Sequence, residues 1–400
     1  MTDESAGFRD EVRGFLEHSL PSDWPGIGAL SPSERDRFRG RWRQSMLEAG
    51  LLGVSWPREY GGRGLGVLEQ AVVQEEFLRA GVPHLPFLWD LSGLILLGPT
   101  LLAWGTDEQK RHFLPRILSG EDRWCQGYSE PEAGSDLFAL RTRAHLVGDD
   151  WVLNGQKIWT SHADQANWIF CLARTEPDIA RAPGISFLLV PMDQPGVDVR
   201  PIRTMTGEAE FCEVFFTDAR TRREDIVGGR GEGARVSLTL LEFERSVSAS
   251  GKHIGYTIEF ERLLRLIKSS GQDGDPLIRQ KIARAYAQIQ VMRFGGQAAL
   301  QQVTEGGSMG PQASILKLLE SEYHQFVTEL AMETLGSRAL VKQGLPGPGG
   351  IQADPLGTPN TVSAWQEQYL TARAKTIYGG SAQIQRNTIA ERLLGMPRER

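Results

Sequence analysis

Hydrophobic residues recur at helical spacing in the first 120 residues of the chain. Apolar side chains occupy the i, i+4, i+7 and i+8 positions counted from Phe8, and residues 38–49 carry a second amphipathic pattern. Residues 106–109 read Thr-Asp-Glu-Gln, a capping box that starts a further helix. This part of the chain is therefore predicted to be helical.

The pattern changes to that of β-strands near residue 122. Asn154-Gly155 lies between two apolar runs, which is a strong hairpin signal because both residues tolerate positive φ. Pro, Gly and Asp separate further strand-like runs, which cover residues 168–173, 185–190, 197–202 and 211–216. These features predict a small antiparallel sheet or barrel.

A helical period returns after Gly233. Apolar residues form one stripe from Val236 to Ile258, as on a single long helix. Further segments with helical spacing cover residues 278–300, 312–335, 364–373 and 383–394. Such a series of helices is typical of a bundle, and the proline-rich residues 344–360 are expected to be a loop or a mobile insertion.

The order of these patterns predicts an α+β multidomain protein, and a chain of 400 residues has room for two or three domains. We expect an N-terminal α-helical domain (1–121), a middle antiparallel β-barrel domain (122–232) and a C-terminal four-helix bundle domain (233–400).

The composition argues against several classes of partner. Lys and Arg total 44 and Asp and Glu total 50, so the net charge is −6, which disfavours binding to nucleic acid or to an anionic membrane. The longest apolar stretch, residues 91–104, is interrupted by polar residues and is too short to span a bilayer. The three cysteines are far apart in the sequence and lack metal-ligand spacing, and the first residues lack the basic region of a secretion signal. We therefore expect a cytoplasmic protein without a metal site.

Two segments of the middle part have residues suited to ligand binding. Residues 126–136, Gln-Gly-Tyr-Ser-Glu-Pro-Glu-Ala-Gly-Ser-Asp, predict an exposed, tightly turned segment whose N–H groups and hydroxyls can surround a ligand; a plain loop is the alternative. Residues 154–161, Asn-Gly-Gln-Lys-Ile-Trp-Thr-Ser, offer the flat ring of Trp159 and the hydroxyl of Ser161. These groups suit a planar heteroaromatic ring, unless Trp159 is a core residue.

A third segment begins the last helix. Residues 378–387 read Tyr-Gly-Gly-Ser-Ala-Gln-Ile-Gln-Arg-Asn, in which the two glycines allow close backbone approach. Ser381 lies at a helix N-terminus, where free N–H groups favour phosphate. A Gly-Gly turn with a serine cap is the simpler interpretation.

The three segments together resemble the acyl-CoA dehydrogenase family of flavoproteins. The likeness spans nearly the whole chain in the right order, and Gly-Thr-Asp-Glu-Gln-Lys at residues 105–110 adds a fourth match. Within that family, the chain resembles the branch that carries its catalytic Glu on a bundle helix, as isovaleryl and long-chain enzymes do.

The resemblance implies FAD as cofactor and an acyl-CoA thioester as substrate. The positions that it implies for FAD binding are Gln126, Tyr128, Ser129, Trp159, Thr160, Ser161, Ser381 and Gln383. Among them, Trp159 would flank the flavin ring, Ser161 would bond near its N5, and Ser381 would touch the diphosphate. The substrate positions that it implies are Ser135, near the CoA phosphates, together with Arg245 and Gly379.

The catalytic base is expected at Glu244. Many family members carry the base in a Tyr-Glu-Gly-Thr motif, but here that place is Gly379. The chain has instead a Glu244-Arg245 dipeptide, as in the isovaleryl and long-chain branches. Glu244 lies at the edge of an apolar stripe, where desolvation would raise its pKa toward a value useful for a base. Glu242 is the competitor, but its i, i+3 spacing to Arg245 favours a solvated pair.

Two departures from the family pattern concern the residues by which a neighbouring subunit binds FAD. Residues 268–280 lack the usual Phe-Gly, and the usual Gln-x-x-Gly-Gly appears as Glu-Thr-Leu-Gly-Ser at residues 333–337. An anionic Glu near a diphosphate is unfavourable unless it is protonated or displaced. Family branches with such losses include heteromeric pairs that act on steroid side-chain thioesters.

The interpretation is an FAD-dependent dehydrogenase that converts an acyl thioester, branched or bulky, to the trans-2-enoyl thioester. The expected assembly is a homodimer or homotetramer, with a heteromer as an option, and the expected acceptor is electron-transfer flavoprotein or a similar protein. Two alternatives stay open: a half-site subunit of a heteromeric acyl-CoA dehydrogenase, and an oxygen-using oxidase on the same fold.

Overall fold

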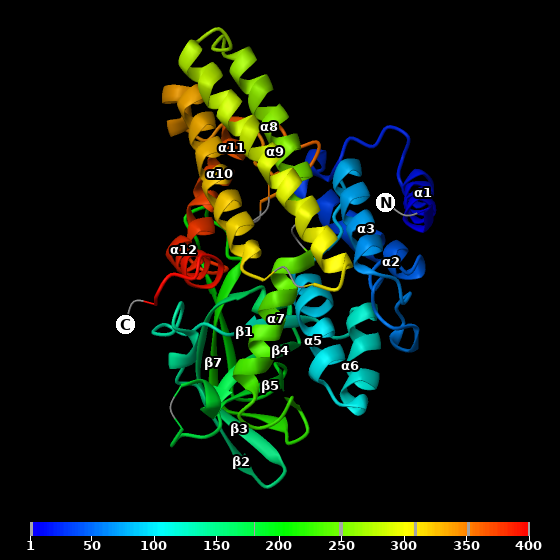
Figure 1. Ribbon diagram of the computed structural model, residues 1–400, viewed down its shortest axis with the longest axis vertical. Helices are drawn as coiled ribbons and strands as arrows, with labels where there is room; N and C mark the ends of the chain where they lie inside the picture. The colour runs from blue at the N-terminus through cyan, green and yellow to red at the C-terminus, as the bar shows by residue number, and fades with distance from the viewer. Residues whose placement is uncertain (1–2, 180, 248–250, 308–309, 350–352, 399–400) are drawn as a thin grey trace. The chain divides into compact units, whose positions relative to one another are not determined.

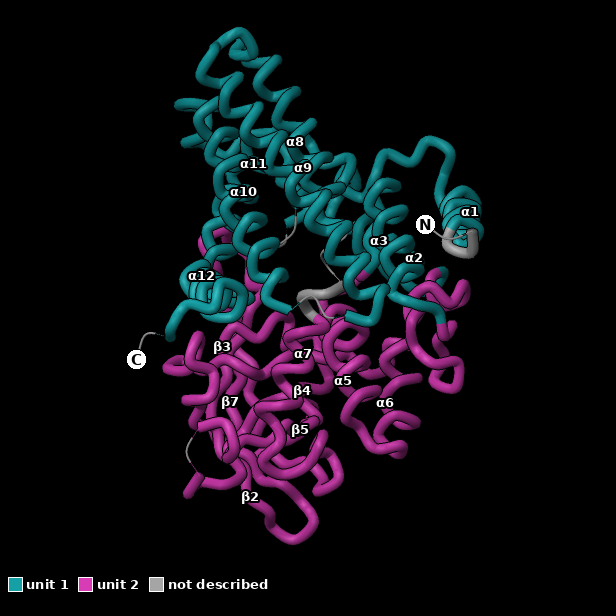
Figure 2. The backbone as a smooth tube through the Cα atoms, in the orientation of Figure 1, with its two compact units in different colours: residues 1–45, 65–84, 245–400 teal, residues 46–64, 85–244 magenta. Residues whose placement is uncertain are grey.

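The computed structural model describes residues 3–179, 181–247, 251–307, 310–349 and 353–398, and leaves out the side chains of residues 3–5 and 244–247 (Figure 1). The chain forms two compact units (Figure 2). Unit 1 comprises residues 1–45, 65–84 and 245–400, and unit 2 comprises residues 46–64 and 85–244. The predicted order of helical, β and helical parts is confirmed, whereas the boundaries of the three expected domains stay a prediction.

Unit 1 is helical. Its α-helices are α1 (Asp3–Ser19), α2 (Pro32–Glu48, ending in unit 2), α3 (Val67–Ala80), α8 (Lys252–Ser269), α9 (Pro276–Thr304), α10 (Gln312–Leu335), α11 (Val362–Ala372) and α12 (Ala382–Thr388). Shorter helical segments are η1 (Ile27–Ala29), η7 (Gly336–Leu340), η8 (Arg373–Thr376) and the π-helical η9 (Ile389–Leu393). The segments predicted at residues 278–300 and 312–335 correspond to α9 and α10.

Helices α8 to α11 surround one apolar core. Its fully buried members include Leu263, Ile267, Tyr323, Val327 and Trp365. Removing such side chains from water stabilises the unit by about 1.5–3 kcal/mol for each large aliphatic residue. The sequence also sets where α9 begins, because the Asp275 carboxylate accepts hydrogen bonds from two N–H groups of its first turn.

The single long helix predicted from Val236 to Ile258 is wrong. The chain forms α7 (Gly233–Val247) and then α8, whose N-cap residue is Gly251. Residues 248–250 lie outside the described part. The apolar spacing did not reveal the interruption because its helical period continues on both sides, while Gly251 is a poor helix former.

Unit 2 combines helices with a β-sheet. Its helical segments are η2 (Arg58–Tyr60), α4 (Leu88–Asp90), the π-helical η3 (Leu91–Leu97), α5 (Gly98–Trp104), α6 (Asp107–Ser119), η4 (Leu137–Ala139), η5 (Ala163–Gln165), η6 (Ala182–Gly184) and most of α7. The capping box at residues 106–109 is confirmed: Thr106 Oγ1 accepts a bond from the Gln109 N–H at 3.2 Å, and Gln109 Oε1 accepts one from the Thr106 N–H at 3.0 Å. None of the helices in the described part of the chain is both long and apolar enough to cross a bilayer.

The sheet has eight strands, with the order β6-β7-β3-β2-β4-β5-β8 and β1 paired to β4. The strands are β1 (Trp124–Gly127), β2 (Arg143–Val147), β3 (Asp150–Ser161), β4 (Trp168–Arg174), β5 (Ile185–Pro191), β6 (Val197–Ile202), β7 (Phe211–Arg222) and β8 (Ile226–Val227). The pairing is antiparallel except that β1 and β2 each run parallel to β4. The three cysteines, distant in sequence, meet in the buried core of this sheet.

The hairpin predicted at Asn154-Gly155 is wrong. Strand β3 continues through both residues, and the turn lies before it, between Val147 and Asp150, where Gly148 has φ +62°. Gly155 is needed for a different reason: a Cβ there would lie 2.4 Å from Thr142 Oγ1. Asn154 also has another role, since its side-chain amide exchanges hydrogen bonds of 2.9 and 3.0 Å with Asp218 on β7.

Candidate active site

The two ligand-binding segments of unit 2 are joined by direct bonds. The Ile158 N–H donates to the Ser129 carbonyl at 3.0 Å. Lys157 Nζ, which is fully buried, donates to Glu130 Oε1 at 2.7 Å and to the Tyr128 carbonyl at 3.2 Å. The two segments therefore lie against each other within one unit.

Glu130 is the center of this junction. Besides Lys157, its carboxylate accepts bonds from the N–H groups of Arg141 at 2.6 Å and Thr142 at 3.0 Å. Burial raises the pKa of Glu130, but the Lys157 charge and the hydrogen bonds outweigh it, so the pKa is lowered. Burial lowers the pKa of Lys157. The ion pair fixes the end of β1 against β3.

Trp159 is not a core residue. A register shift between Lys157 and Thr160 interrupts the pairing of β3 with β7, and Trp159 at this position has φ +62°. Its side chain is 56% exposed and meets Phe211 edge-on at 6.1 Å. Positive φ is strained for an aromatic residue, and bulges of this kind redirect side chains. The exposed indole can stack on a flat ring.

The neighbouring predicted residues differ in exposure. Ser161 is exposed, Gln126 and Ser129 are half-buried, and Tyr128 is buried edge-on against Phe170 and Phe187. Thr160 is buried, and its hydroxyl has no hydrogen-bond partner among the described residues. An orphaned hydroxyl beside an exposed indole fits a planar ring with polar edges, as the flavin of FAD has.

Ser135 lies in the exposed part of the first segment. Glu130 and Ala133 exchange backbone hydrogen bonds of 3.0 and 3.1 Å, which closes the expected tight turn, and Ser135 follows it on the surface. An exposed serine in this place is accessible to a phosphate group.

The third segment belongs to unit 1 and precedes α12. Gly379 and Gly380 have φ of +62° and +85°. The Ser381 hydroxyl accepts a bond from the Ile384 N–H at 3.3 Å and so caps the helix, as the simpler interpretation expected. Gln383 is exposed. The capping role of Ser381 leaves its hydroxyl proton able to donate to an anion.

The side chains of the predicted base, Glu244, and of Arg245 lie outside the described residues. The helix that contains them, α7, is present. The competitor Glu242 is exposed, in line with its interpretation as a solvated residue.

The unusual Glu333 forms an ion pair with Lys281. Lys281 Nζ donates to both of its carboxylate oxygens, at 2.6 and 2.5 Å, and the Glu333 side chain is 51% exposed. The ion pair offsets part of the negative charge that would repel a diphosphate, and the carboxylate stays half-exposed.

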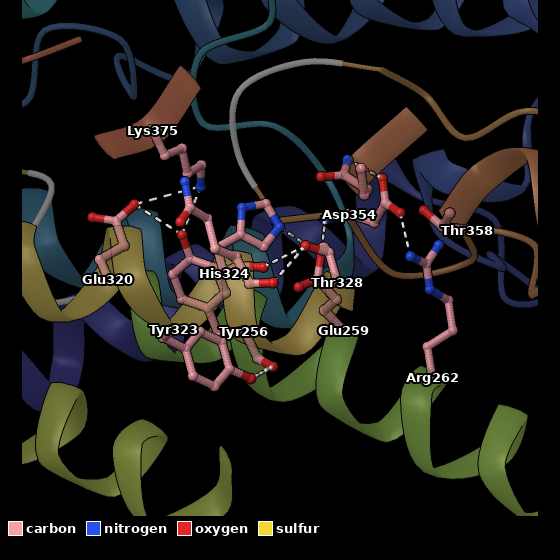
Figure 3. A network of polar contacts seen from close by, with 12 residues as sticks. Tyr256, Glu259, Arg262, Glu320, Tyr323, His324, Thr328, Asp354, Thr358 and Lys375 are labelled. Carbon is pink, nitrogen blue, oxygen red and sulfur yellow. Dashed lines mark hydrogen bonds and ion pairs between the residues drawn. The ribbon is translucent and has the colours of Figure 1, made fainter. Parts of the chain in front are cut away.

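A buried polar network in unit 1 was missed by the sequence analysis (Figure 3). Lys375 Nζ donates to the Tyr256 hydroxyl at 2.7 Å, and that hydroxyl donates to Glu320 Oε1 at 2.9 Å. Lys252 Nζ donates to Glu320 Oε2 at 2.6 Å. Burial raises the pKa of Glu320, but the two ammonium groups outweigh it and the pKa falls to about 2.

A second part of the network lies around Glu259. Its carboxylate is 3.2 Å from His324 Nε2 and accepts a bond from the Asp354 N–H at 3.3 Å. Asp354 in turn pairs with Arg262 at 2.5 Å and accepts a bond from Gln368 at 2.6 Å. Burial raises the pKa of Asp354 to about 6. The one available signal was spacing, because Tyr256, Glu259 and Leu263 share one face of a helix.

Comparison with known proteins identifies the family. Three family models match the chain: the N-terminal domain of acyl-CoA dehydrogenase at residues 2–121, its middle domain at residues 125–219 and its C-terminal domain at residues 231–394. Acyl-CoA dehydrogenase IpdE1 of Mycobacterium tuberculosis is 45% identical over 98% of both chains. Two solved structures are also similar. One is the Tcur3481-Tcur3483 steroid ACAD, with a TM-score of 0.81 and 30% identity over 100% of this chain and 99% of that one. The other is the ChsE4-ChsE5 complex from Mycobacterium tuberculosis, with a TM-score of 0.77 and 28% identity over 100% and 99%. The chain therefore belongs to the acyl-CoA dehydrogenase family, a family of flavoprotein oxidoreductases, as its motifs predicted.

Proposed function

We propose that this protein is an FAD-dependent acyl-CoA dehydrogenase that forms the trans-2-enoyl thioester from an acyl thioester. The observation that carries the proposal is the exposed indole of Trp159, held at a bulge whose strand is bonded to residues 128–130 by Lys157. FAD, when bound, accepts a hydride from the substrate β-carbon.

The chain's own residues would hold FAD in two groups. In unit 2, Gln126, Tyr128, Ser129, Thr160 and Ser161 would contact the ring beside Trp159. In unit 1, Ser381 and Gln383 would bind the diphosphate, and the surface position of Ser135 suits the CoA phosphates. A bulge near the end of β3 with an unpaired Thr160 hydroxyl and the half-exposed Trp159 indole supports this assignment.

Glu244 is proposed as the base that removes the α-proton, and Arg245 as its neighbour in the substrate site. The negative charge that then develops on the thioester oxygen needs a hydrogen-bond donor. We assign this role to the Gly379 N–H, for which the described residues offer no acceptor. The absent side chain at Gly379 also leaves room for a branched or bulky acyl group.

The substrate and the assembly are proposed from the relatives and from Glu333. One similar structure is named a steroid ACAD, which favours a bulky acyl group here as well. A homodimer or homotetramer that passes electrons to electron-transfer flavoprotein or a similar acceptor is the first proposal, in the cytoplasm. A half-site subunit of a heteromeric enzyme is the second, favoured by the Glu333–Lys281 pair at a position where the family has Gln.

The experiment is anaerobic bleaching of the purified yellow protein by a panel of linear, branched and polycyclic acyl-CoAs. The wild type should bleach with at least one of them, and Glu244→Gln should bleach about 100- to 10,000-fold more slowly, as expected for loss of a general base. Glu242→Gln is the matched control and should behave as wild type, since Glu242 is exposed.

Three results would redirect the assignment. Bleaching of Glu244→Gln at the wild-type rate would exclude Glu244 as the base. Turnover with oxygen but not with a dye acceptor would favour the oxidase. A colourless protein that binds FAD only with a second, homologous chain would favour the half-site subunit.

A further inference from the structure

The turn formed by Gly379 and Gly380 is held by two side chains from different helices. Lys317 of α10 donates from Nζ to the carbonyls of Lys375 at 2.6 Å and Gly380 at 2.9 Å. Gln385 of α12 donates from Nε2 to the carbonyls of Gly379 at 3.0 Å and Gly380 at 3.3 Å. The two donors meet at the Gly380 carbonyl, so the turn is clamped from both sides.

The bonds from Lys317 and Gln385, here called the clamp, restrain a flexible part of the backbone. Two consecutive glycines with φ of +62° and +85° can leave that conformation easily, because glycine has more backbone freedom than any other residue. The charged Lys317 donor is the stronger kind, since a hydrogen bond from a charged group is shorter and stronger than one between neutral groups. Gln385 is buried, and a Cβ on Gly380 would lie 2.4 Å from its Nε2, so the amide fits closely against the turn.

The segment before the turn is anchored as well. Gln325 of α10 donates to the carbonyls of Ala372 and Arg373 and to the Thr376 hydroxyl, at 3.3, 3.4 and 3.0 Å. Lys375 is bonded to Tyr256 and paired with Glu320, as Figure 3 shows. With the two glycine carbonyls occupied, the turn keeps its backbone donors uncommitted: no described residue accepts a bond from the N–H groups of Gly379, Gly380 or Ser381. The Gly379 N–H is the one assigned above to the thioester oxygen.

We propose that Lys317, assisted by Gln385, is a positioning residue that aims the Gly379 N–H at the thioester oxygen. This inference deepens the proposed function and rests on it. Lys317 acts through the backbone, by holding the carbonyls of Lys375 and Gly380, which lie before and after Gly379 in the chain, while Gln385 holds the Gly379 carbonyl itself. Loss of the clamp should therefore weaken enolate stabilisation while leaving substrate affinity nearly unchanged.

The test uses full-length, FAD-loaded Lys317→Met, with Lys110→Met as the matched control. Lys110 is also a partly buried helical lysine, and its ammonium faces Asp107. The probe is acetoacetyl-CoA, whose 1,3-dicarbonyl enolises far more readily than a simple acyl thioester. Bound enolate is measured by its ultraviolet absorption as the pH is varied.

Lys317→Met should raise the pH midpoint of enolate formation by up to about 2 units, because the roughly 100-fold loss caused by removing one oxyanion donor is the upper limit for a substitution that only misdirects it. With an acyl-CoA that bleaches the wild type, kcat should fall by about the same factor and KM by less than threefold. Lys110→Met should match wild type in both. A wild-type midpoint in Lys317→Met overturns the positioning role.

Hydrogen exchange followed by mass spectrometry tests the clamp without any catalysis. Peptides covering residues 376–385 should exchange at least tenfold faster in Lys317→Met, and unchanged exchange overturns the clamp. If wild type fails to enolise the probe, the proposed function fails while exchange still decides the clamp. If Lys317→Met does not fold, Gln385→Met should show the same raised pH midpoint and the same faster exchange of residues 376–385.

Discussion

The buried ion pair between Lys157 and Glu130 permits a quantitative prediction about unit 2. Lys157→Met removes the ammonium group but keeps a side chain of similar length. At 2.7 Å the Coulomb attraction in a medium of effective dielectric constant about 20 is roughly 6 kcal/mol, most of which offsets the cost of burying the two charges. Breaking a buried pair by removing one partner costs about 3–5 kcal/mol. We expect Lys157→Met to lower the free energy of unfolding by about 3 kcal/mol, at the lower end of this range, because Glu130 keeps its bonds from two backbone N–H groups.

The pH dependence gives this prediction a second, independent readout. In wild type the folded-state pKa of Glu130 is lowered, so its contribution is present above its ordinary pKa and is lost as pH falls through the lowered value. In Lys157→Met the charge that lowers the pKa of Glu130 most strongly is gone, and burial acts to raise that pKa. The variant therefore regains stability as the pH falls and Glu130 becomes protonated. The difference between the two proteins should be largest at neutral and higher pH and should narrow as the pH falls toward the ordinary pKa of a glutamate.

The assay is urea unfolding at pH 8 and pH 5, followed by tryptophan fluorescence, for wild type, Lys157→Met and Lys157→Met/Glu130→Gln. The double variant should be more stable than Lys157→Met, because it no longer buries an uncompensated carboxylate. FAD should also dissociate more readily from Lys157→Met, since the segments that it joins carry Tyr128 and Trp159. Equal stability of wild type and Lys157→Met at pH 8, or a difference that does not change with pH, would refute the reasoning.

Two further substitutions test the other sites. The pKa of Glu320 is about 2, against an ordinary value of 4.5, so the ionised carboxylate contributes about 3 kcal/mol to stability above pH 4.5, and this contribution is lost as the pH falls through 2. The difference in unfolding free energy between wild type and Glu320→Gln should therefore shrink by more than half between pH 7 and pH 3. Trp159→Gly removes the stacking surface and also the strain of φ +62°, so FAD affinity measured by fluorescence titration should fall at least tenfold while the apoprotein is unchanged or about 1 kcal/mol more stable. An apoprotein destabilised by more than about 2 kcal/mol would mean that Trp159 packs in the core after all.

The motifs predicted the local structure of the site better than they predicted the bonds between distant segments. Residues 126–136 form the expected tight turn, because small residues act locally on the backbone. Trp159 is exposed, as the ligand-binding interpretation of its segment required. The Asn-Gly hairpin failed because each residue has a tertiary role that no local pattern reveals. Asn154 bonds Asp218, 64 residues away, and Gly155 makes room for Thr142.

The buried network was invisible for a related reason. Tyr256 is 64 positions from Glu320 and 119 from Lys375, and a lone Glu or Lys on a helix usually reads as a solvated surface residue. Packing of α8 against α10 places these groups in a low-dielectric interior, where each is tolerated only because the others neutralise it. Their pairing is a consequence of the assembled bundle, so no single segment contains the information.

The same reasoning applies to the Gly379 turn. Its glycines can be recognised from sequence, and they explain how the backbone can adopt left-handed φ, but they do not explain why it stays there. The restraint comes from Lys317, 63 positions from the carbonyl of Gly380 that it binds, and from Gln325 and Gln385. A motif made of glycine therefore specifies where a donor can be presented, and the side chains of α10 and α12 specify its direction. Substitutions confined to the two glycines would test where the donor is presented, whereas only substitutions of Lys317, Gln325 or Gln385 test its direction.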